Sequence, residues 1–384
     1  MTTGARPQTI FFSAFEPSGD DLAAAVIRAL RAERPRIEVV AVGGPKMADA
    51  GADVLEFTTD NPVMGLPGLR TIVEHMELND RIEGLLASRR IDLHVPTDSP
   101  AANFPVCRIT RRMDARIVHV VAPQMWAWGS WRVRKLRRLT DLVLCLLPFE
   151  PEWFRARGVP AEFIGHPIFD DPLDESRQGD PNAIALLPGS RSREFARVFP
   201  LQLEILAALR RTRPSLRVLI AAVSSRAERE LRAAAERAAG WPPNAEVLVG
   251  DVDAAIARAG FVIACSGTVS LRVARHRRPM IVVYRVEPVG YALIGRRLIA
   301  AEHRALPNLA AGARIVPEFI PLEGPAAPAI AAAESLLDSP EARAEQTASL
   351  DRVARLFESR TAAKDAAARI LAFLDRAPEQ EPEP

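Results

Sequence analysis

Short apolar runs alternate with longer amphipathic segments along the first half of the chain. Continuous apolar runs of this length are typical of parallel strands that helices cover on both faces. The predicted strands are Thr9–Ala14, Val39–Val42, Ile91–Val95, Arg116–Val121 and Leu142–Leu147. Helices predicted between some of them include Asp21–Ala32 and Trp131–Arg138.

A stretch rich in Pro and Asp, Gly165–Pro181, interrupts this pattern and is predicted to be a linker. The pattern restarts at Ala183. The strands predicted in the second half are Ile184–Leu187, Val218–Ala222, Val247–Val249, Phe261–Ala264 and Met280–Tyr284. The helices predicted there are Glu194–Arg211, Arg226–Ala239 and Val289–Ala300. Two successive arrays of this kind predict an α/β protein with two Rossmann-like, doubly wound domains that face one cleft.

The C-terminal region is alanine-rich from Ala326 to Asp375 and is predicted to be helical, with a break near Pro340. The acidic, Pro-rich residues Ala377–Pro384 are predicted to be disordered. The predicted boundaries are a first domain over 1–168, a second over 182–340, C-terminal helices over 341–376 and a tail over 377–384.

Length and composition agree with two cytoplasmic domains. A chain of 384 residues exceeds the size at which single cores stop growing. The net charge of +2 is too small to favour a nucleic-acid partner. Cys107, Cys145 and Cys265 form no CxxC pair, and we expect buried free thiols in a reducing compartment.

Membrane contact, if present, is expected to be peripheral. Residues Met1–Gln8 are short and polar, unlike a signal peptide. No uncharged apolar run approaches the ~18–20 residues that span a bilayer. From Met64 onward, however, apolar residues recur at near-helical spacing, namely Met64, Leu66, Leu69, Ile72, Val73 and Met76. This pattern predicts an amphipathic helix that faces either lipid or, by base rate, the core.

Candidate chemistry lies in the loops that follow the predicted strands. In Phe15–Asp20, Ser18 or Asp20 can cap the next helix, and Gly19 allows a ligand close to the backbone. In Thr97–Asn103, Asp98 is a candidate general base; the alternative is a turn-capping Asp. Gly43–Met47 follows another strand and reads most simply as a strand-to-helix turn.

The second half contains two candidate anion sites. Gly189, Ser190 and Arg191 lie between a predicted strand and helix, where backbone N–H groups, the helix dipole and a guanidinium attract phosphate. The loop lacks the lysine and spacing of a P-loop. Ser266-Gly267-Thr268 offers a second helix start for a nucleotide, with a plain helix cap as the alternative.

An aromatic and basic cluster follows the strand Arg116–Val121. Trp126 and Trp128 precede Arg132, Arg134, Lys135, Arg137 and Arg138. They could form a wall for a sugar or acyl chain with cations near a phosphate, or simply pack while the basic helix face is solvated. The six histidines show no HxxxH or HxH spacing, so no metal site is predicted.

Taken in order, the motifs resemble the lipid-A-disaccharide synthase family from about residue 10 to 320. The segments that carry the resemblance are Glu16–Asp20, Gly43–Met47, Val63–Gly65, Asp98 with Asn103, Pro123–Trp128, Leu146–Glu150, Phe163–Pro167, Leu186–Arg191, Ser266–Thr268 and Leu306–Leu309. The resemblance implies a GT-B fold, with an acceptor and lipid domain followed by a nucleotide-sugar domain. It implies an inverting transfer from UDP-2,3-diacylglucosamine to the 6-hydroxyl of 2,3-diacylglucosamine 1-phosphate, without a metal or other cofactor.

The resemblance also implies roles for single residues. Asp98 matches the general base, and the acceptor or lipid side comprises Trp126, Trp128 and the helix around Met64–Met76, which matches the membrane-associating region. The donor side comprises Glu16, Ser18, Gly19, Gly189, Ser190, Arg191, Ser266, Gly267, Thr268, Arg272 and Asn308. The implied partners are the two acylated sugars and the inner face of the cytoplasmic membrane. The family also suggests C-terminal helices that cross back to the first domain or exchange within a homodimer.

Several positions depart from the family pattern. Phe15 and Pro17 replace Gly and Thr in the first loop, Ala101 and Ala102 replace Asp and Phe after Asp98, and Pro321 replaces a Gln. Arg272 stands where the family has a Glu that resembles a ribose-binding acid, and a cation cannot accept hydroxyl hydrogen bonds. Two alternatives stay open: a divergent paralogue that binds UDP-sugar or lipid without this turnover, and a UDP-sugar epimerase, for which Asp98, Glu16 and His119 fit only loosely.

Overall fold

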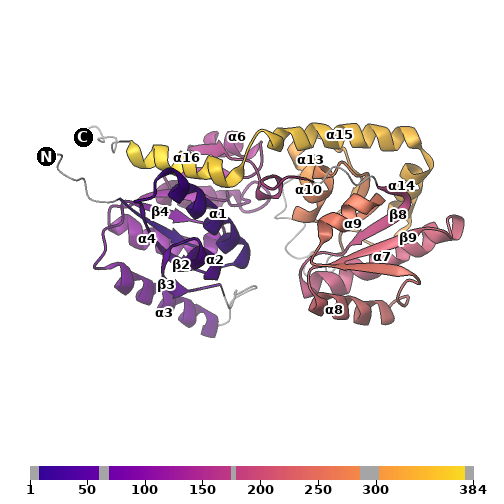
Figure 1. The fold of residues 1–384 in the computed structure, drawn as a ribbon, viewed down its shortest axis with the longest axis horizontal. Helices are drawn as coiled ribbons and strands as arrows, with labels where there is room; N and C mark the ends of the chain where they lie inside the picture. Colours follow the sequence, from indigo (N-terminus) through magenta and orange to yellow (C-terminus); the bar gives the residue numbers. More distant parts are fainter. Residues whose placement is uncertain (1–7, 60–68, 174–178, 286–301, 377–384) are drawn as a thin grey trace. The chain divides into compact units, whose positions relative to one another are not determined.

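The computed structural model describes residues 8–59, 69–173, 179–285 and 302–376. These residues divide into two compact units, unit 1 (1–170 and 360–384) and unit 2 (171–359) (Figure 1). The predicted helix Val289–Ala300, the predicted tail 377–384, and the candidate lipid residues Met64 and Leu66 lie outside the described residues.

Unit 1 contains a parallel sheet of seven strands in the order β3-β2-β1-β4-β5-β6-β7. Its strands are β1 Thr9–Ser13, β2 Glu38–Gly43, β3 Asp53–Phe57, β4 Leu93–Pro96, β5 Arg116–Val120, β6 Leu142–Cys145 and β7 Ala161–Phe163. The strand order reverses between β1 and β4, and in open α/β sheets ligands bind at the carboxyl ends of the strands beside such a switch point.

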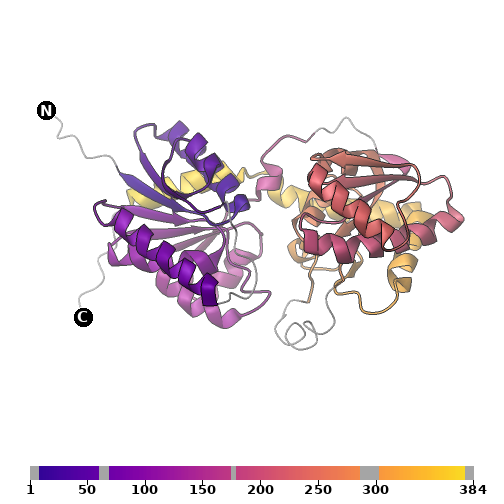
Figure 2. The ribbon, with the colours of Figure 1, turned by 90° about the horizontal axis from the view of Figure 1, so that it is seen from below.

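Helices cover both faces of this sheet, as the continuous apolar strands require. They are α1 Pro17–Glu33, α2 Pro45–Asp49, α3 Leu69–Leu86, α4 Pro100–Arg112, α5 Val133–Leu139, α6 Glu150–Arg155 and α16 Ala362–Asp375, with 3-10 turns at Ser130–Arg132 and Pro167–Phe169. Helix α1 contacts both α2 and α16, and in the other layer α4 contacts both α3 and α5 (Figures 1 and 2).

Helix α16 belongs to unit 1 although it is encoded last. Ala366, Ala367 and Ile370 are fully buried in the core that α1 and the sheet build. The N–H groups of Ala362 and Ala363 donate to the Asp170 carboxylate at 2.6 and 3.0 Å. The C-terminal helices expected over 341–376 are therefore divided between the two units, because a second break follows Glu358.

Unit 2 repeats the strand order of unit 1 in a six-stranded parallel sheet, β10-β9-β8-β11-β12-β13. Its strands are β8 Asp180–Leu187, β9 Arg217–Ala222, β10 Ala245–Val249, β11 Ala259–Cys265, β12 Met280–Val283 and β13 Glu318–Phe319. Its helices are α7 Ser192–Thr212, α8 Ser225–Glu236, α9 Val252–Arg258, α10 Thr268–Arg275, α13 Leu306–Ala311, α14 Ala327–Asp338 and α15 Pro340–Glu358. The switch point lies between β8 and β11.

The two parallel sheets confirm the predicted fold class, a doubly wound α/β fold in each unit. The prediction missed β3, β7 and β13, which are strands of five, three and two residues that are only partly buried. Edge strands of this kind lack the continuous apolar run by which buried strands are recognised. Cys107, Cys145 and Cys265 are buried free thiols, as predicted.

Candidate active site

At the switch point of unit 1, the loops after β1 and β4 contact each other. The Ser18 hydroxyl lies 3.5 Å from Asp98 Oδ2. The Ser99 hydroxyl donates to Glu16 Oε1 at 2.6 Å. A Cβ at Gly19 would lie only 3.2 Å from the Thr97 carbonyl oxygen, so glycine allows the two loops to approach. Half-buried Glu16 and Asp98, exposed Ser18 and buried Gly19 therefore lie together in unit 1.

Asp98 has an unusual backbone conformation. Its φ is 57° and that of Ser99 is 36°, so two consecutive non-glycine residues are left-handed. Asp is among the residues that tolerate this conformation best. The Asp98 N–H donates to the Val120 carbonyl at 2.9 Å, which ties the loop to the end of β5. The Asp98 carboxylate is thus held at the carboxyl end of β4 by a backbone that hydrogen bonds fix.

Asp20, in the first turn of α1, holds the loop after β2. Its buried carboxylate accepts from the N–H groups of Gly44, Lys46 and Met47, each at 3.1 Å. A Cβ at Gly44 would lie 2.2 Å from Asp20 Oδ2, so only glycine fits there. The Gly43–Met47 motif is a strand-to-helix turn that Asp20 caps, as the simpler interpretation predicted.

The predicted phosphate loop of unit 2 already holds an anion of its own chain. The N–H groups of Ser190 and Arg191 both lie 3.3 Å from Glu194 Oε2, and Arg191 Nη1 lies 3.2 Å from Glu194 Oε1. Gly189 has a φ of 108°, which glycine adopts without strain. A phosphate bound at these amides must displace the Glu194 side chain.

The second loop of unit 2 lies beside the first. Gly267, with a φ of 122°, caps α10, and the Ser270 hydroxyl donates to its carbonyl at 2.8 Å. Gly267 and Thr268 are exposed and Ser266 is half-buried. A Cβ at Gly189 would lie 3.2 Å from the Cys265 sulfur at the end of β11, so the two loops are neighbours at the switch point.

Arg272 forms an ion pair with Asp253 on α9. Asp253 also contacts His276, whose Nε2 lies 2.8 Å from Asp253 Oδ1. These contacts lower the pKa of Asp253 against the desolvation that raises it. Arg272, the cation expected at the place of an acid, is thus paired with a carboxylate on α9.

Asn308 does not reach any of these loops with its side chain. It is fully buried, and its Oδ1 accepts from the N–H groups of Ile315 and Val316 at 2.8 and 2.9 Å. Its Nδ2 donates to the Val316 carbonyl at 3.0 Å. In this conformation Asn308 closes the turn after α13.

The two tryptophans of the aromatic cluster differ in environment. Half-buried Trp126 donates from Nε1 to Glu150 Oε1 at 2.9 Å and packs edge-on against Phe149. Trp128 is 46% exposed, and the Arg132 guanidinium lies 3.9 Å from the centre of its ring. Trp126 is thus a packing residue, and Trp128 is open to a ligand.

Buried titratable groups in unit 1 make its stability depend on pH. Burial raises the pKa of Glu150 to about 7, so this group stabilises the fold less as pH rises from about 4.5 to 7. Burial lowers the pKa of His119 to about 4 and also lowers that of His94, so both destabilise the fold as pH falls below 6.5. Below pH 6.5, unfolding lets two imidazoles take up protons while one carboxyl releases its proton, so the fold loses stability as the pH falls.

We therefore expect the unfolding free energy to fall as the pH decreases from 6.5 to 5, by on the order of 1 kcal/mol per pH unit. Urea titrations at each pH measure this slope. His119→Phe should make it nearly flat, because one imidazole then balances Glu150. An unchanged slope in this variant would show that His119 titrates normally in the folded protein.

The apolar residues of α3 are not all directed at the core. Ile82 and Leu86 are fully buried, whereas Val73 and Met76 are 53% and 60% exposed. For Val73 and Met76 the core-facing interpretation is therefore wrong. Leu69 and Ile72 lie in the first turn of the same helix. Among the described residues, no helix is long and apolar enough to cross a membrane.

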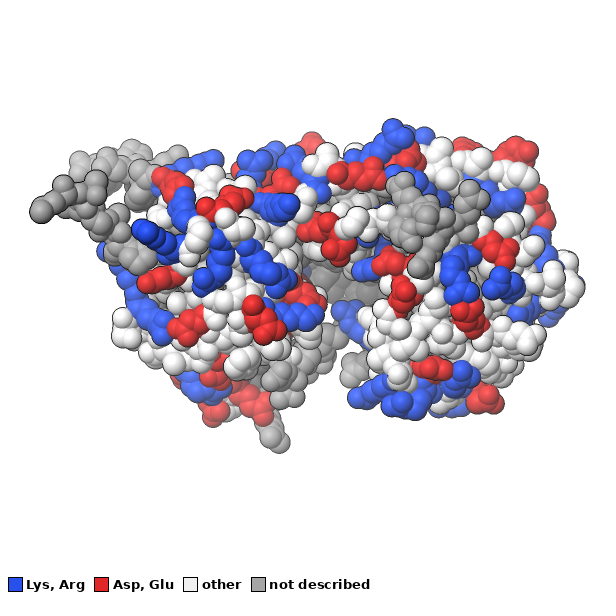
Figure 3. Space-filling view, in the orientation of Figure 1, with Lys and Arg blue, Asp and Glu red and all other residues white. Residues whose placement is uncertain are grey.

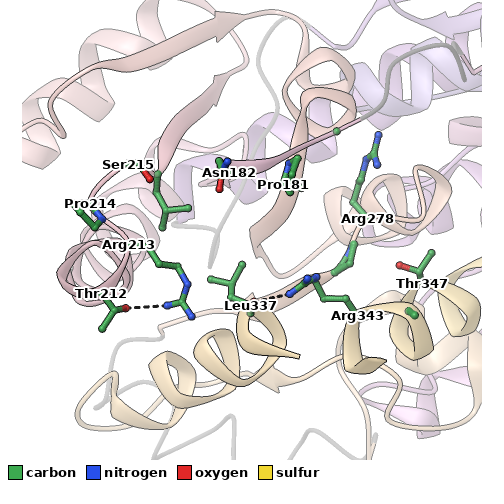
Figure 4. A pocket seen from close by; sticks show the side chains of 15 residues that line it. Pro181, Asn182, Thr212, Arg213, Pro214, Ser215, Arg278, Leu337, Arg343 and Thr347 are labelled. Carbon is green, nitrogen blue, oxygen red and sulfur yellow. Dashed lines mark hydrogen bonds between the residues drawn. The ribbon is translucent and has the colours of Figure 1, made fainter. Parts of the chain in front are cut away.

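A cavity of about 640 Å³ in unit 2 lies at the amino-terminal ends of β8, β9 and β11. Arg213, Arg278 and Arg343 surround it (Figure 4). Arg213 pairs with Asp338, Arg278 donates to the Ala257 carbonyl, and Arg343 donates to the carbonyl groups of Leu336 and Leu337. The bonds of Arg213 and Arg343 join the ends of helices. The cavity lies at the amino ends of the strands, so it is separate from the candidate active site at their carboxyl ends.

On the face shown in Figure 3, basic and acidic side chains are interspersed, so the described surface there has no predominant charge. Within the described ranges, no group of three or more His, Cys, Asp or Glu side chains is placed to hold a metal ion. The residues that sequence reasoning missed are partners, chiefly Glu194 and Asp253. Of these two, only Glu194 could have been found from the sequence, because it lies three residues after the cap residue Arg191, the spacing of a capping box.

Comparison with known proteins bears on the whole chain. A family model described as lipid-A-disaccharide synthetase matches residues 10–371. The lipid-A-disaccharide synthase of Azotobacter vinelandii is 37% identical over 375 residues, covering 94% of this chain and 97% of that protein. The enzyme of the same name from Rhodospirillum centenum is 36% identical over 372 residues, covering 91% of this chain and 90% of its own.

Solved structures share the fold at low identity. A glycotransferase of kitacinnamycin has a TM-score of 0.64 at 15% identity, covering 96% of this chain and all 100% of that one. Acinetobacter baumannii MurG has a TM-score of 0.58 at 14% identity, covering 95% and 100%. A UDP-GlcNAc 2-epimerase from Neisseria meningitidis has a TM-score of 0.61 at 11% identity, covering 96% and 99%. These likenesses show the fold and do not separate transferase from epimerase.

Proposed function

The chain belongs to the lipid-A-disaccharide synthetase family, and on that premise we propose that it transfers 2,3-diacylglucosamine from its UDP donor to the 6-hydroxyl of 2,3-diacylglucosamine 1-phosphate. Membership makes it a glycosyltransferase of lipid A biosynthesis with a GT-B fold; the donor, acceptor and product are the proposal. The observation that supports catalysis best is Asp98, held in a left-handed conformation beside Ser18 at the switch point of unit 1.

In the proposed reaction, Asp98 takes the proton of the acceptor's 6-hydroxyl as that oxygen attacks the anomeric carbon of the donor sugar. The new C–O bond forms as the bond to UDP breaks, and UDP leaves with the electron pair. The configuration inverts. No step requires a metal or another cofactor.

The donor side is assigned to the loops of unit 2. Backbone N–H groups of Ser190 and Arg191, with the Arg191 guanidinium, would hold the diphosphate once Glu194 swings away. Ser266, Gly267 and Thr268 would face the nucleoside, and Asn308 would shape this side indirectly, through the turn that it closes.

The direct experiment is a product assay with purified protein, UDP-diacylglucosamine and the acylated sugar phosphate. Disaccharide and UDP in equal amounts are expected. UDP binding without any product would support the second candidate, a paralogue that binds without this turnover. That candidate is favoured by the occupied phosphate loop and by Arg272.

Arg272 calls for a double substitution. Arg272→Glu alone would place two carboxylates side by side and remove the ion pair with Asp253. Asp253→Arg/Arg272→Glu restores the family's acid and keeps the pair. We expect the double variant to bind UDP several-fold more tightly than wild type, and Arg272→Glu alone to bind less tightly than the double variant, by calorimetry.

The matched control reverses another ion pair of the same unit, Glu246 with Arg258, which lie 2.5 Å apart. Glu246→Arg/Arg258→Glu should leave UDP affinity unchanged. If Arg272→Glu alone binds UDP as tightly as the double variant, Asp253 has no influence on the nucleotide site.

We also propose that the protein works at the inner face of the cytoplasmic membrane, as a peripheral protein. Support comes from exposed Val73 and Met76 on α3 and from Trp131, which is 61% exposed beside the basic helix α5. Exposed tryptophan and cations suit the interface of an anionic bilayer.

Sedimentation with vesicles of phosphatidylethanolamine and phosphatidylglycerol tests this placement. Val73→Glu/Met76→Glu should lower the bound fraction several-fold, because two charges enter the apolar contact. Leu356→Glu is the control, since Leu356 is an apolar residue of unit 2 with 42% exposure. Equal losses in both variants would argue against a specific membrane-facing helix.

A further inference from the structure

The left-handed backbone at Asp98 and Ser99 is held in part by one buried side-chain amide, that of Asn103. Such a conformation costs roughly 1–2 kcal/mol per residue, so it persists only where other contacts fix it. Asn103 Nδ2 donates to the Asp98 carbonyl at 2.7 Å and lies 3.2 Å from the Thr97 carbonyl. Asn103 is fully buried and comes from the first turn of α4.

The orientation of that amide is set by Ser13, the last residue of β1. The Ser13 hydroxyl donates to Asn103 Oδ1 at 2.5 Å. An amide whose oxygen is held in this way must turn its nitrogen toward the Asp98 carbonyl. Ser13 has only one proton to give. Any other partner of its oxygen must therefore be a donor.

That donor is His94 on β4. Its Nε2 lies 2.7 Å from the Ser13 oxygen, so Nε2 carries the ring proton. The opposite nitrogen, Nδ1, is then an acceptor and lies 2.8 Å from the Thr110 hydroxyl of α4. Burial lowers the pKa of His94, which keeps the ring neutral with one donor and one acceptor. The hydrogen bonds run in one direction, from Thr110 through His94, Ser13 and Asn103 to the backbone of Asp98.

We propose that Ser13, His94 and Asn103 are positioning residues that act through this buried hydrogen-bond chain to fix the Asp98 carboxylate for proton removal. The proposal rests on the proposed function, in which Asp98 is the base. None of the three side chains contacts substrate; all three are fully buried. Three elements meet in the chain, β1, β4 and α4, and these are the elements that frame the switch point.

The central variant is Asn103→Ala, with kcat and KM measured separately. We expect kcat to fall at least tenfold, with KM for each substrate within about twofold of wild type, because the loop binds as before but the carboxylate is no longer aimed. His94→Gln, which retains an N–H donor toward Ser13, should keep more of kcat than His94→Phe. Thr140→Val is the control, because Thr140 is a buried residue of the same unit whose hydroxyl donates to the Leu136 carbonyl, and it should keep wild-type kcat.

Non-additivity separates positioning from general destabilisation. Asp98→Asn/Asn103→Ala should be no slower than Asp98→Asn alone, because the amide acts only through that carboxylate. A multiplied loss, or wild-type kcat in Asn103→Ala, would overturn the proposal. Absence of product from the wild-type enzyme would instead speak against the proposed function.

If the wild-type enzyme forms no product, the hydrogen-bond chain can still be tested by measurements that need no turnover. ¹⁵N NMR of the imidazole should show the Nε2–H tautomer for His94. Hydrogen exchange at the Asp98 amide should be slow in wild type and faster in Asn103→Ala, while exchange in the β9 strand of unit 2 stays the same. An Nδ1–H tautomer, or unchanged protection at Asp98, would refute the chain whether or not the enzyme turns over.

Discussion

Replacing Asp98 with asparagine is expected to lower kcat by about 10²–10⁴-fold, the usual contribution of a general base. Asparagine has nearly the same shape and also tolerates the left-handed backbone that this position requires. The Ser18 contact and the bonds to the backbone of Asp98 can remain. The variant therefore removes the basic oxygen and little else. Product formation under saturating substrates measures the effect, and calorimetry should show unchanged UDP affinity.

Asp21→Asn provides the matched control for this loss. Asp21 lies on α1 and forms an exposed ion pair with Lys46. It should keep wild-type kcat. If Asp98→Asn stays within about fivefold of wild type, the base lies elsewhere, and Glu16, which shares the loop contact through Ser99, becomes the next residue to test.

The largest effect on stability is expected from Asp20→Ala. The substitution leaves the N–H groups of Gly44, Lys46 and Met47 without their acceptor in a buried turn. Hydrogen bonds to a charged group contribute about 1.5–3 kcal/mol each, and part of that is offset by the desolvation of the carboxylate. We expect the unfolding free energy of unit 1 to fall by about 3 kcal/mol.

Tryptophan fluorescence during urea unfolding follows this loss well. Four of the five tryptophans, Trp126, Trp128, Trp131 and Trp153, belong to unit 1, and only Trp241 belongs to unit 2. Asp21→Ala, one residue further along α1, should change the unfolding free energy by no more than about 0.5 kcal/mol, since it lies on the surface. Equal effects of the two substitutions would mean that the buried turn contributes nothing special.

The fold was predictable wherever a strand is buried on both faces. The runs at Thr9–Ser13 and Arg217–Ala222 are buried almost throughout, and their apolar letters alone identify them. The sequence DVLEF of β3 and the two-residue β13 could not be found in the same way, because edge strands are defined by a neighbour rather than by their own composition. Likewise, the sequence of α16 does not indicate against which unit the helix packs.

The sequence predicts which loops form the candidate site, but it does not predict which side chains contact one another there. Asp98 and the glycine-serine loops follow strands that are easy to recognise, and their place at a sheet edge then follows from topology. The contacts of Arg272 with Asp253, and of Ser13 with His94 and Asn103, join residues 19 to 90 positions apart. A side chain's charge or hydroxyl does not indicate such a partner until the strand order brings the two together.

Helix α16 imposes an order on the synthesis of this protein. Its buried residues Ala366, Ile370 and Leu374 complete the apolar core that begins with β1. On the ribosome, unit 1 must wait with an uncovered helix layer while about two hundred further residues are made, a time of roughly ten to forty seconds at ordinary elongation rates. Unit 2, which is continuous in sequence, can close first. The domain that is translated first is therefore the last to be finished, and a premature stop early in the fourteen codons of α16 leaves it open to aggregation and proteolysis.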